Sequence, residues 1–168
     1  NTSSIARPWA PPIFRDGDAL YRIDSCRPQN QAVEEGKIEM HALGRGSYPG
    51  QRLGLKDLPG VPCMGFWDAH HQQDWGLDPH RNEGVEISLL ETGRMDFLVD
   101  DQAHALRQGD LTITRPWQRH CLGDPNIRAC RLFWMILDVE SGNGRSAWEF
   151  PAWIGPDSES RRELLRVF

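Results

Sequence analysis

The chain has 168 residues, a net charge of −5 and a mean hydropathy of −0.58. This length predicts one domain, and no apolar run approaches the ~20 residues that a membrane-spanning helix needs. An acidic domain without a basic stripe is a poor nucleic-acid binder, so any contact with DNA is expected from residues outside this sequence.

Sixteen glycines, twelve prolines and strand-sized apolar runs indicate a mainly β protein. The Pro-rich start, residues 1–18, is predicted to be an extended arm, because proline fixes φ and removes a backbone donor. This arm either lies over the sheet or closes over a ligand. Residues 19–23 suit a short edge strand, residues 37–43 alternate like a half-buried strand, and residues 44–60 are predicted to be a loop.

The second half of the chain alternates between strands and turns. A hairpin is expected around Asp100 and Asp101, and the run 127–139 is predicted to be buried on both faces because it lacks alternation. Ser160 and Glu163 form a capping box before a helix that has only begun at residue 168. The other predicted strands are residues 61–68, 84–91 and 111–114.

The four cysteines and the pair of His70 and His71 are not predicted to be site residues. No two cysteines form a C-x-x-C pair and the start lacks a signal-peptide pattern, so reduced thiols in a cytoplasmic protein are expected. His70 and His71 are neighbours that cannot share one face of a strand, which favours a solvated loop. The cysteines are Cys26, Cys63, Cys121 and Cys130.

His80, Asn82, Glu86 and His120 are the candidate site residues. The first three have even numbers, so in an extended strand they point the same way. His120 ends a later strand-like run and can join them if the two strands are neighbours in one sheet. Two imidazoles, a carboxamide and a carboxylate on one face predict either a metal site or a polar ligand pocket. The alternative is a surface pair of His80 and Glu86.

The spacing of these residues resembles the cupin motifs. His80 and Glu86 have the cupin spacing, six residues separate Glu86 from Gly93, and His120 lies eleven positions after Gly109. The sequence departs from the motifs at three places. Asn82 replaces the second histidine, Pro116 stands one place late, and Gln118 and Arg119 replace a glycine.

The cupin resemblance implies a double-stranded β-helix, which is a jelly-roll barrel. In metal-dependent cupins, His80, Glu86 and His120 would be ligands to a divalent transition metal, with position 82 as the fourth. Two histidines and one carboxylate suit Fe(II), Mn(II) or similar ions. The carboxamide of Asn82 is a poorer ligand for them than imidazole, so a metal-free polar pocket is the alternative.

The whole chain resembles the N-terminal sensor domain of AraC-type transcription regulators. The resemblance implies an arm (1–20), a cupin-like barrel (21–155) and the start of a linker or dimerisation helix (156–168). It also implies a homodimer, a small polar effector such as a sugar, and DNA binding through a later region. The expected ligand-binding residues are His80, Asn82, Glu86, His120, Trp117 and Gln118. We expect no enzyme activity. The alternatives are a metal-dependent cupin dioxygenase or isomerase and, from the seven tryptophans, a carbohydrate-binding module.

Overall fold

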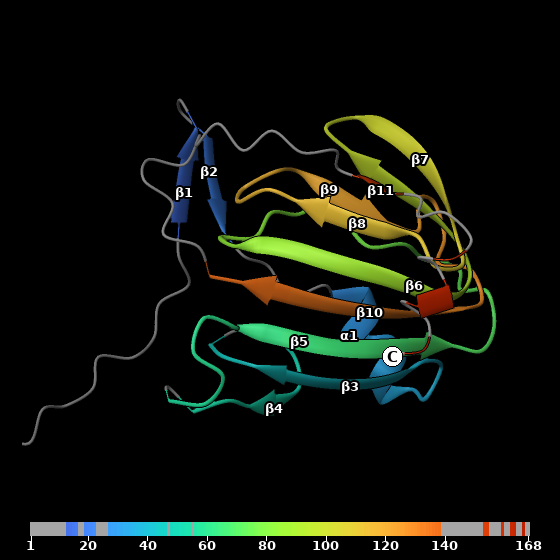
Figure 1. Cartoon of the computed structure of the whole chain (residues 1–168), viewed down its shortest axis with the longest axis horizontal. Helices are drawn as coiled ribbons and strands as arrows, with labels where there is room; N and C mark the ends of the chain where they lie inside the picture. Colours follow the sequence, from blue (N-terminus) through green and yellow to red (C-terminus); the bar gives the residue numbers. More distant parts are fainter. Residues whose placement is uncertain are drawn as a thin grey trace, which may run out of the picture.

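The computed structural model describes residues 13–16, 19–22, 27–46, 48–54, 56–138, 153–154, 159, 162–163 and 166. These residues form a mainly β, cupin-like jelly-roll barrel, as predicted (Figure 1). The elements are β1 (Ile13–Asp16), β2 (Ala19–Arg22), α1 (Arg27–Glu34), β3 (Glu39–Gly44), β4 (Gln51–Arg52), β5 (Cys63–Ala69), β6 (Val85–Val99), β7 (Gln102–Arg107), β8 (Leu111–Thr114), β9 (His120–Leu122), β10 (Cys130–Leu137) and β11 (Trp153–Ile154).

The long strand β6 belongs to both layers of the barrel. Its first part lies between β8 and β10 in the order β11-β8-β6-β10-β5-β3-β4, and its second part pairs with β7 and β9. Gly93 lies between these parts with a φ of +87°, and a Cβ there would be 2.3 Å from the Ala129 carbonyl oxygen. Only glycine allows this conformation and close approach, so Gly93 lets β6 pass from one layer to the other.

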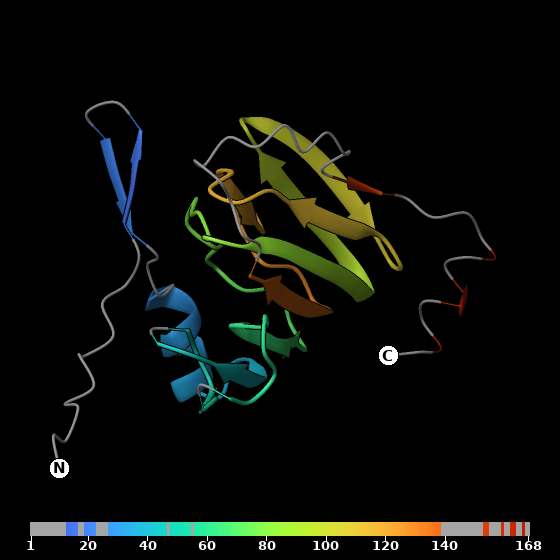
Figure 2. The same ribbon diagram turned by 60° about the vertical axis from the view of Figure 1, so that its left-hand side comes forward.

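The hydrophobic core lies between the layers. Its main cluster includes Trp67 of β5, Leu90 and Phe97 of β6, and Leu132 of β10. The helix α1 contributes Ala32 to this cluster, and Figures 1 and 2 show α1 beside β3 and β5. This helix was missed because it is short and its eight residues are mostly polar. Packing against the barrel stabilises it.

Several strand predictions are confirmed and some need correction. The hairpin is present, with φ of +46° at Asp100 and +64° at Asp101, as a type I′ turn requires. The predicted loop 44–60 contains the short strand β4. In the single chain the fully buried residues of β10 lie on its inner face, while the outward residues Phe133 and Met135 are half-buried, so burial of that outer face by a second layer or a subunit stays a prediction.

The remaining structural predictions have mixed outcomes. His70 and His71 are exposed, and Cys63, Cys121 and Cys130 are buried free thiols, while Cys26 lies outside the described residues. Residues 19–23 were predicted to be a short edge strand, and β2 is one, although it pairs with β1 in a separate two-stranded sheet and not with the barrel. The arm before Ile13 and most of the C-terminal segment lie outside the described residues, although Glu159, Arg162, Glu163 and Arg166 are helical. None of the described helices is long and apolar enough to cross a membrane.

Candidate functional site

Two backbone hydrogen bonds bring His80 and His120 together. Each residue's amide donates to the other's carbonyl, at 2.9 and 3.0 Å, in an isolated antiparallel bridge. The two ring centroids are consequently 4.4 Å apart. The segments that carry His80 and His120 are therefore neighbours, as the sequence-based prediction required.

Glu86 occupies the centre of the group. Its carboxylate accepts hydrogen bonds from the Asn82 amide, from Nε2 of His120 at 3.2 Å and from the Ser88 hydroxyl at 3.3 Å. Asn82, Glu86, Ser88 and His120 are all buried. We call these four residues and His80 the inner polar group.

The ionisation of the group follows from burial and proximity. Burial alone would lower the pKa of His120, but the hydrogen bond and charge of Glu86 raise it above its ordinary value. Burial would raise the pKa of Glu86, yet His120 brings it below its ordinary value. Burial and the His120 charge lower the pKa of His80. These shifts favour an ion pair between His120 and Glu86 beside a neutral His80.

The two imidazoles are oriented as metal-binding histidines are. Nδ1 of His80 lies 2.8 Å from the Asp78 carbonyl oxygen, and Nδ1 of His120 lies 2.9 Å from that of Gln118. Since each Nδ1 donates its proton to a carbonyl, each Nε2 is the atom left to bind a metal. One ligand atom from each of His80, Glu86 and His120 lies within 4.8 Å of the others. These residues fit a divalent transition metal.

The sequence matches the family model for the AraC-like ligand binding domain over residues 68–155. This match includes β6, β9 and the whole inner polar group, and it spans more than half of the 168 residues. The chain belongs to the AraC-like ligand-binding domain family. No curated protein matches the sequence.

Three solved structures are distant neighbours of this AraC-like domain. A cupin 2 conserved barrel domain protein from Leptotrichia buccalis has a TM-score of 0.46 and 16% identity, covering 62% of this chain and 42% of that one. A predicted oxalate decarboxylase from Thermotoga maritima has a TM-score of 0.45 and 15% identity, covering 61% and 81%. A cupin superfamily protein from Desulfitobacterium hafniense has a TM-score of 0.43 and 14% identity, covering 60% and 76%.

Trp117 occupies a strained turn beside the inner polar group of the AraC-like domain. The Gln118 amide donates to the Arg115 carbonyl at 3.1 Å, and Pro116 and Trp117 are the central residues of this turn. Trp117 has a φ of +61°, at the position where a type II turn normally has glycine. A bulky residue with positive φ is a feature of functional sites.

Gln118 is buried, but its side chain has other partners. Its amide donates to Asp100 at 2.6 Å, and its carbonyl oxygen accepts from the Arg115 backbone at 3.0 Å. The structure thus joins His80, Asn82, Glu86 and His120, whereas Gln118 holds the turn that carries Trp117. Ligand binding by Trp117 and Gln118 stays a prediction.

Sequence reasoning missed the hydroxyl groups across the sheet from Glu86. Thr114 is the cross-strand partner of Glu86, and Thr112 is that of Ser88, so these four side chains share the inner face. Thr112 and Thr114 are both buried. The Thr114 hydroxyl has no hydrogen-bond partner among the described residues. The alternation of Thr112 and Thr114 with Leu111 and Ile113 was the available signal.

Proposed function

We propose that the chain is the effector-sensing and dimerisation domain of an AraC-type transcription regulator, binding a small polar effector inside the barrel. The observation that carries this proposal is the inner polar group in a chain of the AraC-like ligand-binding family. A buried polar atom without a partner destabilises the fold, as at Thr114, unless another group bonds to it. A ligand hydroxyl, amine or carbonyl would supply that bond.

The effector would contact His80, Asn82, Glu86 and His120, with Trp117 beside them. The amide of Asn82 and the carboxylate of Glu86 offer both donors and acceptors. Trp117 would present an apolar ring, which suits the apolar face of a sugar. Effector binding must favour one state of the domain over another to act as a signal.

Dimerisation, cytoplasmic location and DNA binding belong to the same proposal. In AraC-type regulators, a helix after the barrel joins two copies and a later region binds DNA. The helical residues Glu159 and Arg162 lie in the corresponding segment of this chain. The acidic composition supports assigning DNA binding to another part of the protein.

A metal-dependent cupin enzyme is the second candidate function. The observation that favours it is the fixed orientation of His80 and His120, whose Nδ1 atoms both bond to backbone carbonyls. His80, Glu86 and His120 would hold a divalent transition metal, which would supply Lewis-acid or redox chemistry when bound. Asn82 would then orient Glu86 through their hydrogen bond.

Ligand screening tests the sensor function directly. We expect small polar compounds, sugars among them, to raise the melting temperature of the chain, and His120→Gln to abolish the shift. His70→Gln is the matched control, because His70 lies on the outside with 65% of its side chain exposed, against 3% for His120. A shift that persists in His120→Gln would place the ligand elsewhere, and the absence of any shift would contradict the proposal.

Elemental analysis and native mass separate the two candidates. A metal-free dimer supports the sensor function. One transition metal per chain that disappears in His120→Gln and persists in His70→Gln would replace it with the enzyme.

A further inference from the structure

The pair formed by Tyr48 and Glu83 lies next to the inner polar group. The Tyr48 hydroxyl donates to a Glu83 carboxylate oxygen at 2.7 Å. Tyr48 is buried and packs with Cys63 and Ile136, and Ile136 is the cross-strand partner of Glu86. The charge of Glu86 contributes to raising the pKa of Tyr48, after burial and the Glu83 carboxylate. Tyr48 and Glu83 therefore extend the polar interior of the barrel beyond Glu86.

Glu83 differs from Glu86 in having no cationic partner among the residues that the structure describes. It makes no ion pair with an arginine, lysine or histidine in the described part of the chain, whereas Glu86 pairs with His120. Burial raises the pKa of Glu83, and the charge of Asp138 raises it further, against the effect of Tyr48. A half-buried carboxylate in such surroundings is stabilised by a positive charge.

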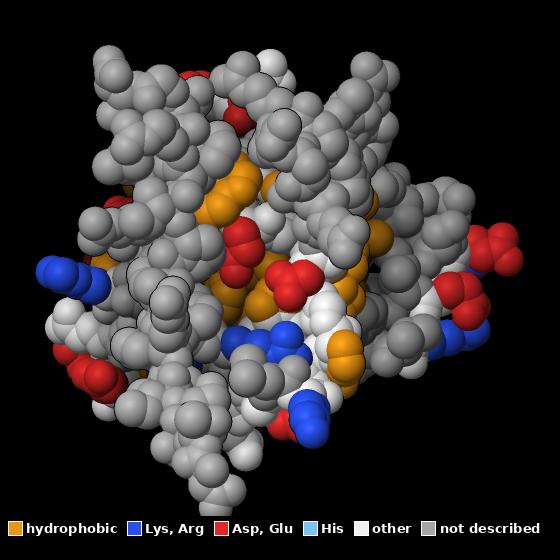
Figure 3. Space-filling model, turned by 90° about the vertical axis from the view of Figure 1, so that its left-hand side faces the viewer, with side chains coloured by type: hydrophobic (Ala, Val, Ile, Leu, Met, Phe, Trp, Pro, Cys, Tyr) orange, Lys and Arg blue, Asp and Glu red, His pale blue; other side chains and the backbone are white. Residues whose placement is uncertain are grey.

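Aromatic rings surround the same end of the barrel. Trp117 and Trp134 pack against the cluster of Tyr48, Cys63 and Ile136. Figure 3 views the end at which β6 begins and β8 and β10 finish, and acidic side chains lie there between hydrophobic side chains and a group of Lys and Arg side chains. Aromatic rings combined with a carboxylate are a favourable environment for organic cations.

We propose that the effector carries an ammonium or amidinium group, which pairs with Glu83 among Tyr48, Trp117 and Trp134. The polar remainder of the effector would reach Glu86 and the open hydroxyl of Thr114. This inference rests on the proposed sensor function and names the chemical class of its ligand. A neutral sugar would leave the charge of Glu83 uncompensated.

The test compares cations with neutral molecules of similar shape. Putrescine, agmatine and choline are titrated into the full chain beside butanediol, the neutral isostere of putrescine, and the sugars arabinose and xylose. We expect at least one cation to bind, and Glu83→Gln to weaken it by about 10- to 100-fold, as for the loss of a charged hydrogen bond. Gln keeps an acceptor for Tyr48, so the variant removes the charge with little change in shape.

Glu83→Gln also has a readout that needs no ligand. Removing an uncompensated charge is expected to raise the melting temperature of the ligand-free chain. Glu39→Gln is the matched control, because that carboxylate lies on the exposed outer surface beside His41. A fall in melting temperature for Glu83→Gln would overturn the inference.

The failures of the two proposals are distinguishable. Neutral compounds that bind as tightly as the cations, or cations that bind Glu83→Gln unchanged, would overturn the inference. If the binding of these neutral compounds or cations is lost in His120→Gln, the sensor function stands. Absence of binding by every compound would overturn both.

Discussion

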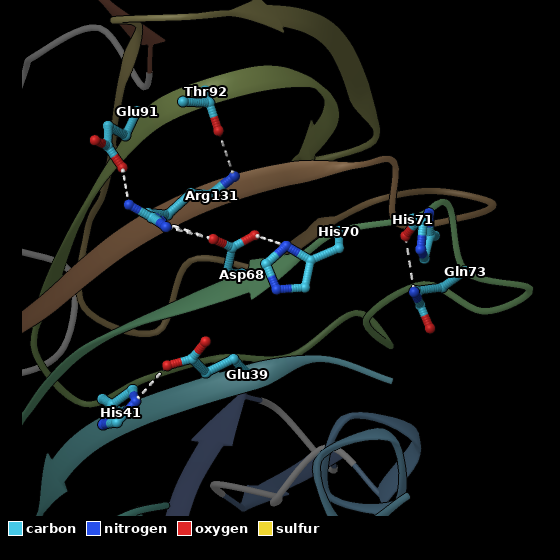
Figure 4. A network of polar contacts seen from close by, with 9 residues as sticks. All are labelled: Glu39, His41, Asp68, His70, His71, Gln73, Glu91, Thr92 and Arg131. Atoms are coloured by element: carbon cyan, nitrogen blue, oxygen red, sulfur yellow. Dashed lines mark hydrogen bonds and ion pairs between the residues drawn. The ribbon is translucent and has the colours of Figure 1, made fainter. Parts of the chain in front are cut away.

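The barrel holds two groups of charged side chains that have similar chemistry but differ in the exposure of their cations. The inner polar group pairs Glu86 with His120, and their side chains are 11% and 3% exposed. The second group, which we call the outer ion-pair network, joins Asp68, His70, Glu91 and Arg131 on the outside of the sheet (Figure 4). There the Arg131 and His70 side chains are 42% and 65% exposed.

The cations of the outer ion-pair network reach water, although the Asp68 side chain between them is only 11% exposed, as is that of Glu86. Arg131 donates two hydrogen bonds to one oxygen of Asp68, at 2.6 and 2.8 Å, and its guanidinium lies 5.9 Å from the Phe66 ring centroid. Exposed pairs of this kind contribute only ~0–1 kcal/mol. The inner polar group has no such access to solvent. The comparison shows that burial of the cation, not of the carboxylate, separates the inner polar group from the outer ion-pair network, because His120 is 3% and Arg131 is 42% exposed.

The largest effect is expected from Glu86→Ala. The substitution leaves the charge of His120 buried without its partner and removes the acceptor for Asn82 and Ser88. Breaking a buried ion pair from one side costs about 3–5 kcal/mol. The free energy of unfolding in urea measures this loss. A loss below about 1 kcal/mol would make the inner polar group resemble the outer network.

The pH dependence of stability is the next test, on chain freed of metal by a chelator. The folded-state pKa of His120 is raised, so its contribution is complete below the unfolded pKa of ~6.5 and is lost as pH rises through the folded value. His80 has a lowered pKa, so its effect appears only as pH falls below ~6.5. The window just above pH 6.5 therefore reports on His120, before the buried thiols Cys63 and Cys130, whose pKa values are raised, add their own decline at higher pH.

We expect the free energy of unfolding to decline across this window, and His120→Gln to flatten the decline. His70→Gln should leave it unchanged, because His70 belongs to the solvated outer network. A decline that survives in His120→Gln would assign the effect to another group.

Local patterns were sufficient to predict most of the barrel. The even-numbered face of His80, Asn82 and Glu86 and the hairpin at Asp100 depend on neighbours in sequence, and the structure contains both. What could not be predicted depends on register between distant strands. Thr114 meets Glu86, and Cys63 meets Ile136, only because β8, β6, β10 and β5 align in one sheet. Tyr48 lay in a segment predicted to be a loop, and nothing local connects it with Glu83.

The turn at Trp117 shows a second reason why a local conformation could not be predicted. A tryptophan with positive φ is unfavourable in isolation, so local preference argues against the conformation that the structure adopts. Here tertiary contacts override it. Arg81 donates to the Trp117 carbonyl at 2.6 Å, and the Trp117 amide donates to the Asn82 carbonyl at 2.7 Å.

Comparing Trp117→Gly with Trp117→Ala measures the strain in this turn. Both variants remove the same ring, so the loss of packing is shared between them. Glycine accepts a φ of +61° without a Cβ clash, and we expect Trp117→Gly to be the more stable by about 1–2 kcal/mol. Urea unfolding of the pair gives the difference directly. If Trp117→Ala is the more stable, the turn is not strained in solution.

The smallest effect is expected from Arg131→Gln in the outer ion-pair network. The substitution removes the partner of Asp68 and Glu91, but His70 remains 3.4 Å from the other oxygen of Asp68. We expect a loss of about 1 kcal/mol or less, which decreases further in ~1 M salt because screening weakens exposed ion pairs. The loss from Glu86→Ala should change little over the same salt range, since buried charges are poorly screened. A salt-insensitive loss of several kcal/mol at Arg131 would mean that the outer network is as isolated from solvent as the inner one.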